Sequence, residues 1–296
     1  MAPLSVSAPD FEIGRHRARH PAEVLTGCRV TARGDDWATA AMILPRFATG
    51  PEVPLGWLGV AADSAAAQSL GGLFAQGLDV RTVDLRLDAV GPVPSPGTVV
   101  TARGDLISSN HRTGLSRIRI HGPDVADVAV GTARFLVVPG SPPSPLSPPS
   151  TPTSTVSESA TGGVPLLPSL DEIFGITDTA RNGNSSVLTA ELDPALCNRH
   201  GVVHGGLHVS LIDHAMRALV GHSGTHEDQG APELLDLTLA YQRPLAPEVD
   251  GTVLLCATVE RRGRRITTVN ATLQTSTGRV LTSAQGTFLS TTEDRP

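Results

Sequence analysis

The chain alternates between helical and strand-like patterns of apolar and polar residues, and the clearest helical pattern covers residues 204–220. Apolar residues recur there at spacings of three and four, which marks one buried face of an amphipathic helix. They are Leu207, Leu211, Ala215, Ala218 and Leu219. In the first half, an apolar segment at 53–57 opens an alanine-rich stretch, which predicts a second helix to about residue 70.

About four strand-like segments follow each predicted helix. They cover 83–87, 98–107, 115–120 and 127–138 in the first half, and 235–239, 252–260, 264–274 and 280–290 in the second. Most alternate apolar with polar residues, and this period of two is typical of an antiparallel sheet with one solvated face. Because a lone helix needs a sheet to cover its apolar face, each half is expected to be an α+β unit with a long central helix wrapped by an antiparallel sheet.

The two halves repeat the same order of elements, which indicates an old duplication. Between them, residues 139–165 are rich in proline, serine and threonine and poor in large apolar residues. Such a segment cannot bury enough surface to offset the entropy of ordering it. We therefore expect an N-terminal domain over 1–138, an extended, partly polyproline linker over 139–165, and a C-terminal domain over 166–296.

Composition excludes several classes of function. All 23 basic residues are arginine, which rules out a Schiff-base lysine and a P-loop lysine. The net charge of -6 argues against nucleic-acid binding. Cys28, Cys197 and Cys256 show no CxxC spacing, so neither a zinc framework nor a disulfide framework is indicated. With no signal-peptide pattern and no apolar run of roughly 20 residues, we expect a cytoplasmic protein without a membrane partner.

The candidate chemistry gathers where the second helix begins. Gly205 and Gly206 stand at its first turn, where backbone N–H groups have no partner inside the helix and attract negative charge. Glycine lets a substrate carbonyl approach those donors closely. His204 precedes the pair, Asn198 stands six residues before it, and Asp213 lies two turns into the helix. Taken singly, each residue also suits a turn, a helix end or close packing.

The spacing of Asn198, His204-Gly205-Gly206 and Asp213 resembles that of the hotdog-fold thioesterases, in particular their PaaI-like branch. The resemblance covers about residues 166–291, and the first half shares it in diluted form. It implies two tandem hotdog domains paired side by side and an acyl-CoA or aryl-CoA substrate, with no resident cofactor. It also makes a homodimer of such chains an expectation.

Aligning the two helix starts predicts one complete site. Val53 falls on Val203, Pro54 on His204, Leu55 on Gly205, Gly56 on Gly206, Asp63 on Asp213, and Ala48 on Asn198. Gly205 and Asp213 lie eight residues apart on one helix, or roughly 12 Å. A carbonyl held at Gly205 therefore needs the acid of the other helix, Asp63. The reciprocal site around Asp213 lacks the Asn, His and Gly and is expected to be degenerate.

Each of these residues has an expected role in thioester hydrolysis. The Gly205 N–H would stabilise the oxyanion, and Asp63 would act as general base or nucleophile. Asn198 and His204 would orient each other, the water or the loop. In some relatives a hydroxyl residue two positions before the Asp of the strand after the helix assists; Thr82 stands there in the first half and Leu234 in the second.

Coenzyme contacts are expected at Gly206 and at Arg262 or Arg264, since the arginine-rich run 260–265 suits phosphate groups. His200, His204 and His208 are spaced by four, which invites a metal interpretation. Gly201 and its turn place His200 before the helix, so we expect no metal. Two alternatives to hydrolysis stay open, namely an enoyl-CoA hydratase and a non-catalytic acyl-CoA-binding or regulatory module.

Overall fold

A computed structural model describes residues 20–50, 52–74, 76–123, 127–140, 164–221 and 232–289. The first half contains α1 (Pro21–Thr26), β1 (Arg29–Arg33), β2 (Trp37–Ile43), β3 (Arg46–Phe47), η1 (Leu55–Leu58), α2 (Gly59–Gln68), α3 (Gly71–Phe74), β4 (Leu78–Ala89), β5 (Val99–Ser109), β6 (Thr113–His121) and β7 (Asp127–Pro139). The second half contains β8 (Leu166–Leu167), α4 (Leu170–Ile173), β9 (Ile176–Asn182), β10 (Ser185–Glu191), η2 (Pro194–Leu196), α5 (Gly205–Val220), β11 (Glu233–Tyr241), α6 (Pro247–Asp250), β12 (Thr252–Arg262), β13 (Ile266–Thr275) and β14 (Val280–Leu289).

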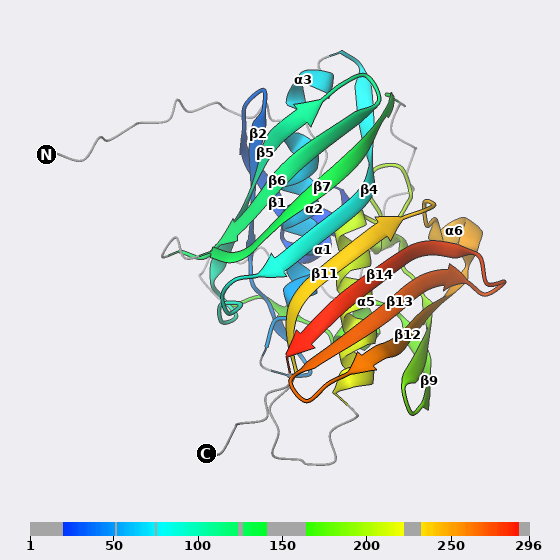
Figure 1. Ribbon diagram of the computed structural model, residues 1–296. Helices are drawn as coiled ribbons and strands as arrows, with labels where there is room; N and C mark the ends of the chain where they lie inside the picture. The colour runs from blue at the N-terminus through cyan, green and yellow to red at the C-terminus, as the bar shows by residue number, and fades with distance from the viewer. Residues whose placement is uncertain are drawn as a thin grey trace, which may run out of the picture.

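Twelve strands form one sheet in the order β1-β2-β5-β6-β7-β4-β11-β14-β13-β12-β10-β9 (Figure 1). Read from either edge, the order of each half is the same, so β1 corresponds to β9 and β4 to β11. The halves join at β4 and β11, which pair antiparallel with Leu85 opposite Leu239 and Leu87 opposite Leu237. The pairing confirms the expected α+β architecture dominated by an antiparallel sheet.

The helices α2 and α5 lie together against one face of this sheet, with the sheet in front of them in Figure 1. Nine of the ten residues of α2 are buried, because alanine and glycine let neighbouring backbones approach from every side. A Cβ on Gly59 of α2 would lie 2.5 Å from the backbone oxygen of Gly206 in α5. The two helix starts therefore touch backbone to backbone.

The strands after each helix lie close to their predicted bounds, and the predicted helix over 204–220 corresponds to α5. The first-half helix is shorter than expected, since η1 precedes it and α2 ends at Gln68. Two strands of the twelve-stranded sheet precede each central helix, and these were not predicted. The edge strands β1 and β9 are mostly exposed, so they carry little apolar alternation to reveal them. Residues 264 and 265, expected in a strand, form the turn between β12 and β13.

The chain returns across the first half before the second half begins. β8 pairs in parallel with β3, and the Arg46 N–H donates to the Pro165 carbonyl at 2.7 Å. Pro139, the first residue of the predicted linker, ends β7. Most of that linker, residues 141–163, lies outside the described residues. None of the described helices has the length and apolar character of a bilayer-spanning segment.

Candidate active site

Asp63 of α2 is buried directly against the start of α5. The Thr82 hydroxyl on β4 donates to its Oδ1 at 2.8 Å, and its Oδ2 lies 3.4 Å from His204 Nδ1. A Cβ built on Gly205 would lie 2.7 Å from Oδ2 and 3.1 Å from the Thr82 hydroxyl oxygen. The structure thus brings a first-half acid and hydroxyl together with the second-half helix start, and only a glycine fits between them.

Side-chain hydrogen bonds hold the first turn of α5 in place at the N-terminus of the helix. His204 is the N-cap, and its Nδ1 accepts the Gly206 N–H at 3.1 Å. The Tyr241 hydroxyl donates to the Gly205 carbonyl at 2.7 Å, which fixes the orientation of that peptide. Within the described part of the chain, no acceptor is paired with the Gly205 N–H. A donor at the positive end of a 16-residue helix is thereby left for an oxyanion.

A chain of polar groups continues on the far side of the His204 ring. With Nδ1 accepting from Gly206, the ring proton belongs on Nε2, which lies 3.4 Å from the Ser64 hydroxyl. Ser64 in turn donates to Glu23 of α1 at 3.2 Å. This tautomer follows from the hydrogen bonds, and it makes His204 a positioning residue for the glycine turn.

Burial raises the pKa of the Asp63 carboxyl above its ordinary value. Attraction to His204 and hydrogen bonds from Thr82 and the Gly206 N–H lower the pKa in part, while repulsion from Glu23 raises it further. A carboxylate with a raised pKa is a stronger base than an exposed one, which suits proton abstraction near neutral pH.

Two cavities meet at Gly205. A small cavity of about 90 Å³ is lined mainly by polar groups, including Asp63, Ser64, Glu23 and Arg199. A larger one of about 320 Å³ runs along Val83, Leu136, Val203, Tyr241 and Leu245 and is mainly apolar. Both are lined by Arg81, Thr82, Asn198 and Gly205. A group held at Gly205 is therefore reached from a polar side and from an apolar side.

Asn198 lines both cavities, but its side chain also stabilises its own turn. Its Oδ1 accepts the His200 N–H at 2.8 Å, and Gly201 in the same turn has a φ of 72° that favours glycine. The side-chain amide nitrogen keeps its hydrogen-bonding capacity for a bound molecule. The turn thus presents Asn198 to the cavities as a donor.

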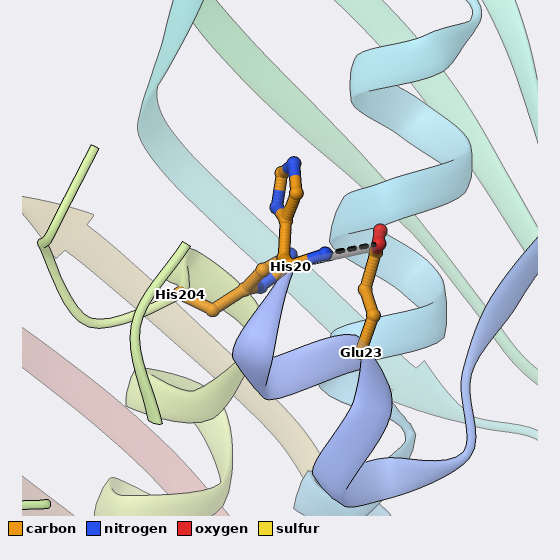
Figure 2. Close-up of side chains that lie close together, drawn as sticks. All are labelled: His20, Glu23 and His204. Carbon is orange, nitrogen blue, oxygen red and sulfur yellow. Dashed lines mark hydrogen bonds between the residues drawn. The ribbon is translucent and has the colours of Figure 1, made fainter. Parts of the chain in front are cut away.

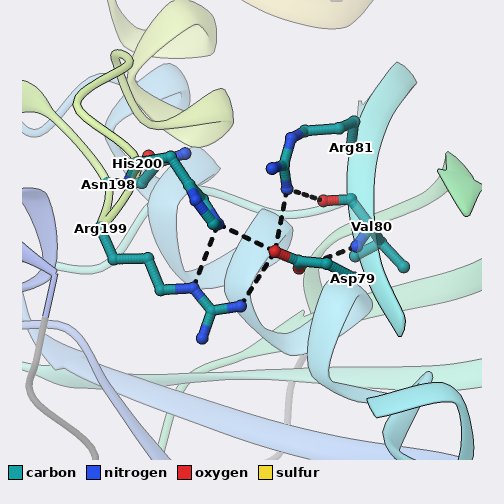
Figure 3. Close-up of polar contacts among 6 residues, drawn as sticks. All are labelled: Asp79, Val80, Arg81, Asn198, Arg199 and His200. Carbon is teal, nitrogen blue, oxygen red and sulfur yellow. Dashed lines mark hydrogen bonds and ion pairs between the residues drawn. The ribbon is translucent and has the colours of Figure 1, made fainter. Parts of the chain in front are cut away.

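Asp79 of β4 joins the Asn198 turn to the first half (Figure 3). Its Oδ2 lies 3.0 Å from Arg199 Nη2, 2.9 Å from His200 Nε2 and 3.1 Å from Arg81 Nη1. Burial raises the pKa of Asp79, but hydrogen bonds from the Val80 N–H and Arg81, and attraction to Arg199, outweigh it and lower the pKa.

Burial and the charge of Arg81 lower the pKa of His200. Asp79 is therefore ionised and His200 neutral at pH 7. This cluster holds the loop before α5 in place against β4 by charge.

The reciprocal acid, Asp213, lies in a different environment. It is fully buried, accepts the Gly56 N–H at 2.8 Å, and forms an ion pair with Arg217 at 2.7 Å. Leu234 lines the nearby cavity of about 570 Å³, at the strand position where the first half has Thr82. Asp213 thus has a built-in counter-ion, and the backbone donor it faces is already used.

The arginines predicted to contact coenzyme are not brought to this site. Arg262 ends β12 and Arg264 lies in the following turn, both exposed. This hairpin is at the Glu233 end of β11, because Ile266 pairs with Leu289 and Leu289 with Glu233. Tyr241, which contacts Gly205, is at the other end of that strand, roughly 27 Å away at 3.4 Å per residue. The charge run indicated phosphate chemistry but could not show its position on the sheet.

Several residues that line the site were not predicted from the sequence. Tyr241, Ser64 and Glu23 carry no motif, and the first two stand alone in apolar strand or helix patterns. The capping pattern of α1, with Glu23 three residues after His20, was the one local signal available.

Residues 193–289 match the family model described as the acyl-CoA thioesterase N-terminal domain. That range contains the Asn198 turn, the glycines and the whole of α5 through β14. Both halves have the hotdog arrangement of a central helix against an antiparallel sheet, and the part that matches the thioesterase model in sequence lies in the second half. The predicted fold class is thereby confirmed, while the narrower PaaI-like branch stays a prediction.

Solved structures resemble the double hotdog over most of its length. The acyl-CoA thioesterase II TesB2 from Mycobacterium marinum has a TM-score of 0.63 at 10% identity, covering 93% of this chain and 99% of that one. A tesB protein from Mycobacterium avium subsp. paratuberculosis has a TM-score of 0.59 at 12% identity, covering 88% and 96%. The 12:0-ACP thioesterase from Umbellularia californica has a TM-score of 0.55 at 11% identity, covering 86% and 94%. At these identities the likeness is one of fold, and no curated protein has a matching sequence.

Proposed function

We propose that the double hotdog is an acyl-CoA thioesterase that releases free acid and coenzyme A at one composite site between its halves. The observation that carries this proposal is the contact of the Asp63 carboxylate with the Gly205 turn. A base from one helix and an oxyanion donor from the other face the same point, which is the arrangement that attack on a carbonyl requires.

The two cavities are assigned different parts of the reaction, one the attacking water and the other the substrate. The small polar cavity beside Asp63 has room for a few water molecules, one of which serves as the nucleophile. The larger, mainly apolar cavity takes the acyl or pantetheine part of the substrate. The thioester carbonyl then lies at Gly205, where the two cavities meet.

The reaction follows from these positions. Asp63 takes a proton from water as the water oxygen bonds to the carbonyl carbon, and the Gly205 N–H and the Asn198 amide stabilise the oxyanion. Collapse of this intermediate breaks the C–S bond, and the departing thiolate takes the proton held by Asp63, which leaves free acid, coenzyme A and ionised Asp63. Hydrogen bonds from the Thr82 hydroxyl and the Gly206 N–H hold the Asp63 carboxylate in place. No metal or redox group takes part in this scheme.

The coenzyme phosphates find cationic partners at the rim of the apolar cavity. Arg81 and Arg243 both line it, and Arg243 is exposed. Guanidinium groups bind phosphate in a bidentate manner. We assign them to the coenzyme in place of Arg262 and Arg264, which lie at the far end of the sheet.

Thiol release from a panel of acyl-CoA and aryl-CoA thioesters tests the activity, and two matched substitutions test the site. Asp63→Asn is expected to lower kcat at least about 100-fold, the usual scale for a lost general base. Asp213→Asn removes the equivalent acid of the other half and is expected to leave kcat within a few-fold.

The reverse pattern, in which Asp213→Asn abolishes turnover and Asp63→Asn does not, would move the chemistry to the other half. Thermal stabilisation by acyl-CoA without any thiol release across the panel would instead make the protein a binding module.

A further inference from the structure

Three side chains with metal-binding chemistry converge beside the His204 ring (Figure 2). His20 and Glu23 come from the start of α1, and His204 from the start of α5. One potential ligand atom of each lies within 4.8 Å of those of the other two. His204 stands more than 180 residues after His20 and Glu23 and belongs to the other half, so no local motif indicates that the three meet.

The fold holds this group together independently of any ligand. The Ala22 N–H of α1 donates to the Cys197 carbonyl, just before the α5 loop, at 3.1 Å. One Glu23 oxygen accepts the His20 N–H at 3.1 Å and the other accepts the Ser64 hydroxyl at 3.2 Å. A carboxylate oxygen can accept a hydrogen bond and bind a cation at the same time. Glu23 is therefore positioned and still able to act as a ligand.

We propose that His20, Glu23 and His204 form a binding site for a divalent cation of the zinc class, with water completing the coordination. Two imidazoles and one carboxylate are a ligand set that zinc accepts, with an open fourth position. Bonds of 2.0–2.2 Å in a tetrahedron bring ligand atoms to about 3.3 Å from one another. Side-chain rotation of the half-buried His20 and Glu23 closes the remaining gap.

His204 is oriented for this role. Its Nε2 faces Ser64 and the α1 side, while its Nδ1 faces the Gly206 N–H and Asp63. A metal ion on Nε2 fixes the ring proton on Nδ1, which then donates to Asp63 Oδ2 across the present 3.4 Å. The Gly206 N–H keeps a partner because it also hydrogen-bonds Asp63. Zinc-bound histidines commonly donate to a carboxylate in this way.

The metal ion and catalysis compete for the same carboxylate. The negative charges of Glu23 and Asp63 repel one another. A dication bound to Glu23 and His204 offsets that repulsion. When the Nδ1 proton of His204 is donated to Asp63 Oδ2, that oxygen is occupied and does not accept a proton from water. Metal binding is therefore inhibitory, and this consequence alone rests on the proposed function.

Calorimetric titration of chelator-treated full-length protein with Zn²⁺ at pH 7, together with X-ray absorption at the zinc edge, tests the site. We expect one Zn²⁺ per chain with imidazole nitrogen in its ligand shell. His20→Ala and Glu23→Gln are each expected to weaken binding at least about tenfold, and Asp63→Asn about 10- to 100-fold. His111→Ala, on the exposed β5–β6 hairpin, is the matched control and leaves binding unchanged.

Affinity that is the same in wild type, His20→Ala and Glu23→Gln, each checked for an unchanged Tm without metal, would overturn the site. So would sulfur in the zinc ligand shell. In the turnover arm, each variant is normalised to its own zinc-free rate. Inhibition is supported if the wild-type hydrolysis rate falls over the same zinc concentrations at which zinc binds. It is overturned if the rate is unchanged at saturating zinc. The binding arm decides the site even if no substrate is turned over.

Discussion

The Asp63 carboxylate is the residue at which stability and activity oppose each other. Its pKa is raised, mainly by burial, so its stabilising contribution is present below its ordinary pKa and lost as pH rises through the folded value. Ionised Asp63 therefore weakens the fold at neutral pH. Asp63→Asn, measured at pH 7 with a chelator present, is expected to raise Tm by about 2 °C or more while turnover is lost.

The same Tm comparison at pH 3, where the carboxyl is protonated, should show little difference between wild type and Asp63→Asn. A lower Tm for the variant at pH 7 would mean that hydrogen bonds to the carboxylate outweigh the cost of burying it.

The Asp63 carboxylate faces Gly205 so closely that a residue with a side chain does not fit at this position. A Cβ there would lie 2.7 Å from Asp63 Oδ2, so Gly205→Ala is expected to displace the carboxylate. A misplacement of roughly 1 Å can cost about 100-fold in rate. Steady-state kinetics should show this loss in kcat with far-ultraviolet circular dichroism unchanged. Wild-type kcat in the alanine variant would show that the carboxylate does not act beside this amide.

The sequence could predict part of this site and not the rest. Helix rise and the alignment of the halves were enough to pair Asp63 with Gly205, because both depend on one regular element in each half. Glu23 and His20 depend on where a six-residue helix docks, which no periodicity reveals. The sequence also does not tell which end of a strand faces the site, so it could not show that Arg262 lies at the end of the sheet away from Gly205.

At the scale of elements, the central helices and the strands after them follow from apolar periodicity, since each has one buried face. The contact between α2 and α5 does not follow from it, because α2 is buried almost all round and its alanines show no polar face. The close contact between α2 and α5 depends on the small side chains of the residues that face each other. Gly59 lies under the Gly206 carbonyl, and a Cβ there would also lie 2.7 Å from Val209 Cβ.

Gly59→Ala is therefore expected to push the two helices apart and lower stability by roughly 1–3 kcal/mol, the usual cost of overpacking. Thermal or urea unfolding measures this. Gly72→Ala in α3 serves as the control, since its added Cβ would lie at an ordinary contact distance of 3.9 Å from the Asp35 carbonyl oxygen. Equal Tm values for the two variants would mean that the helix contact tolerates a wider spacing.

At the scale of the whole molecule, the two halves form one structure. They share a single sheet through β4 and β11, and the site takes residues from both. If residues 1–150 and 151–296 are produced as separate chains, the break lies in the proline-rich segment. We expect neither piece alone to release thiol and the co-expressed pair to do so. Wild-type turnover by either piece alone would contradict a composite site.

Joining the halves in one chain also lets them diverge. In a dimer of identical subunits, every substitution appears twice, so an arginine that neutralises one acid neutralises both. Here Arg217 stands four residues after Asp213, while Ala67 stands four residues after Asp63. A substitution in one half of a fused chain therefore changes one acid and leaves its counterpart unchanged, which is how Asp213 alone has acquired an arginine partner.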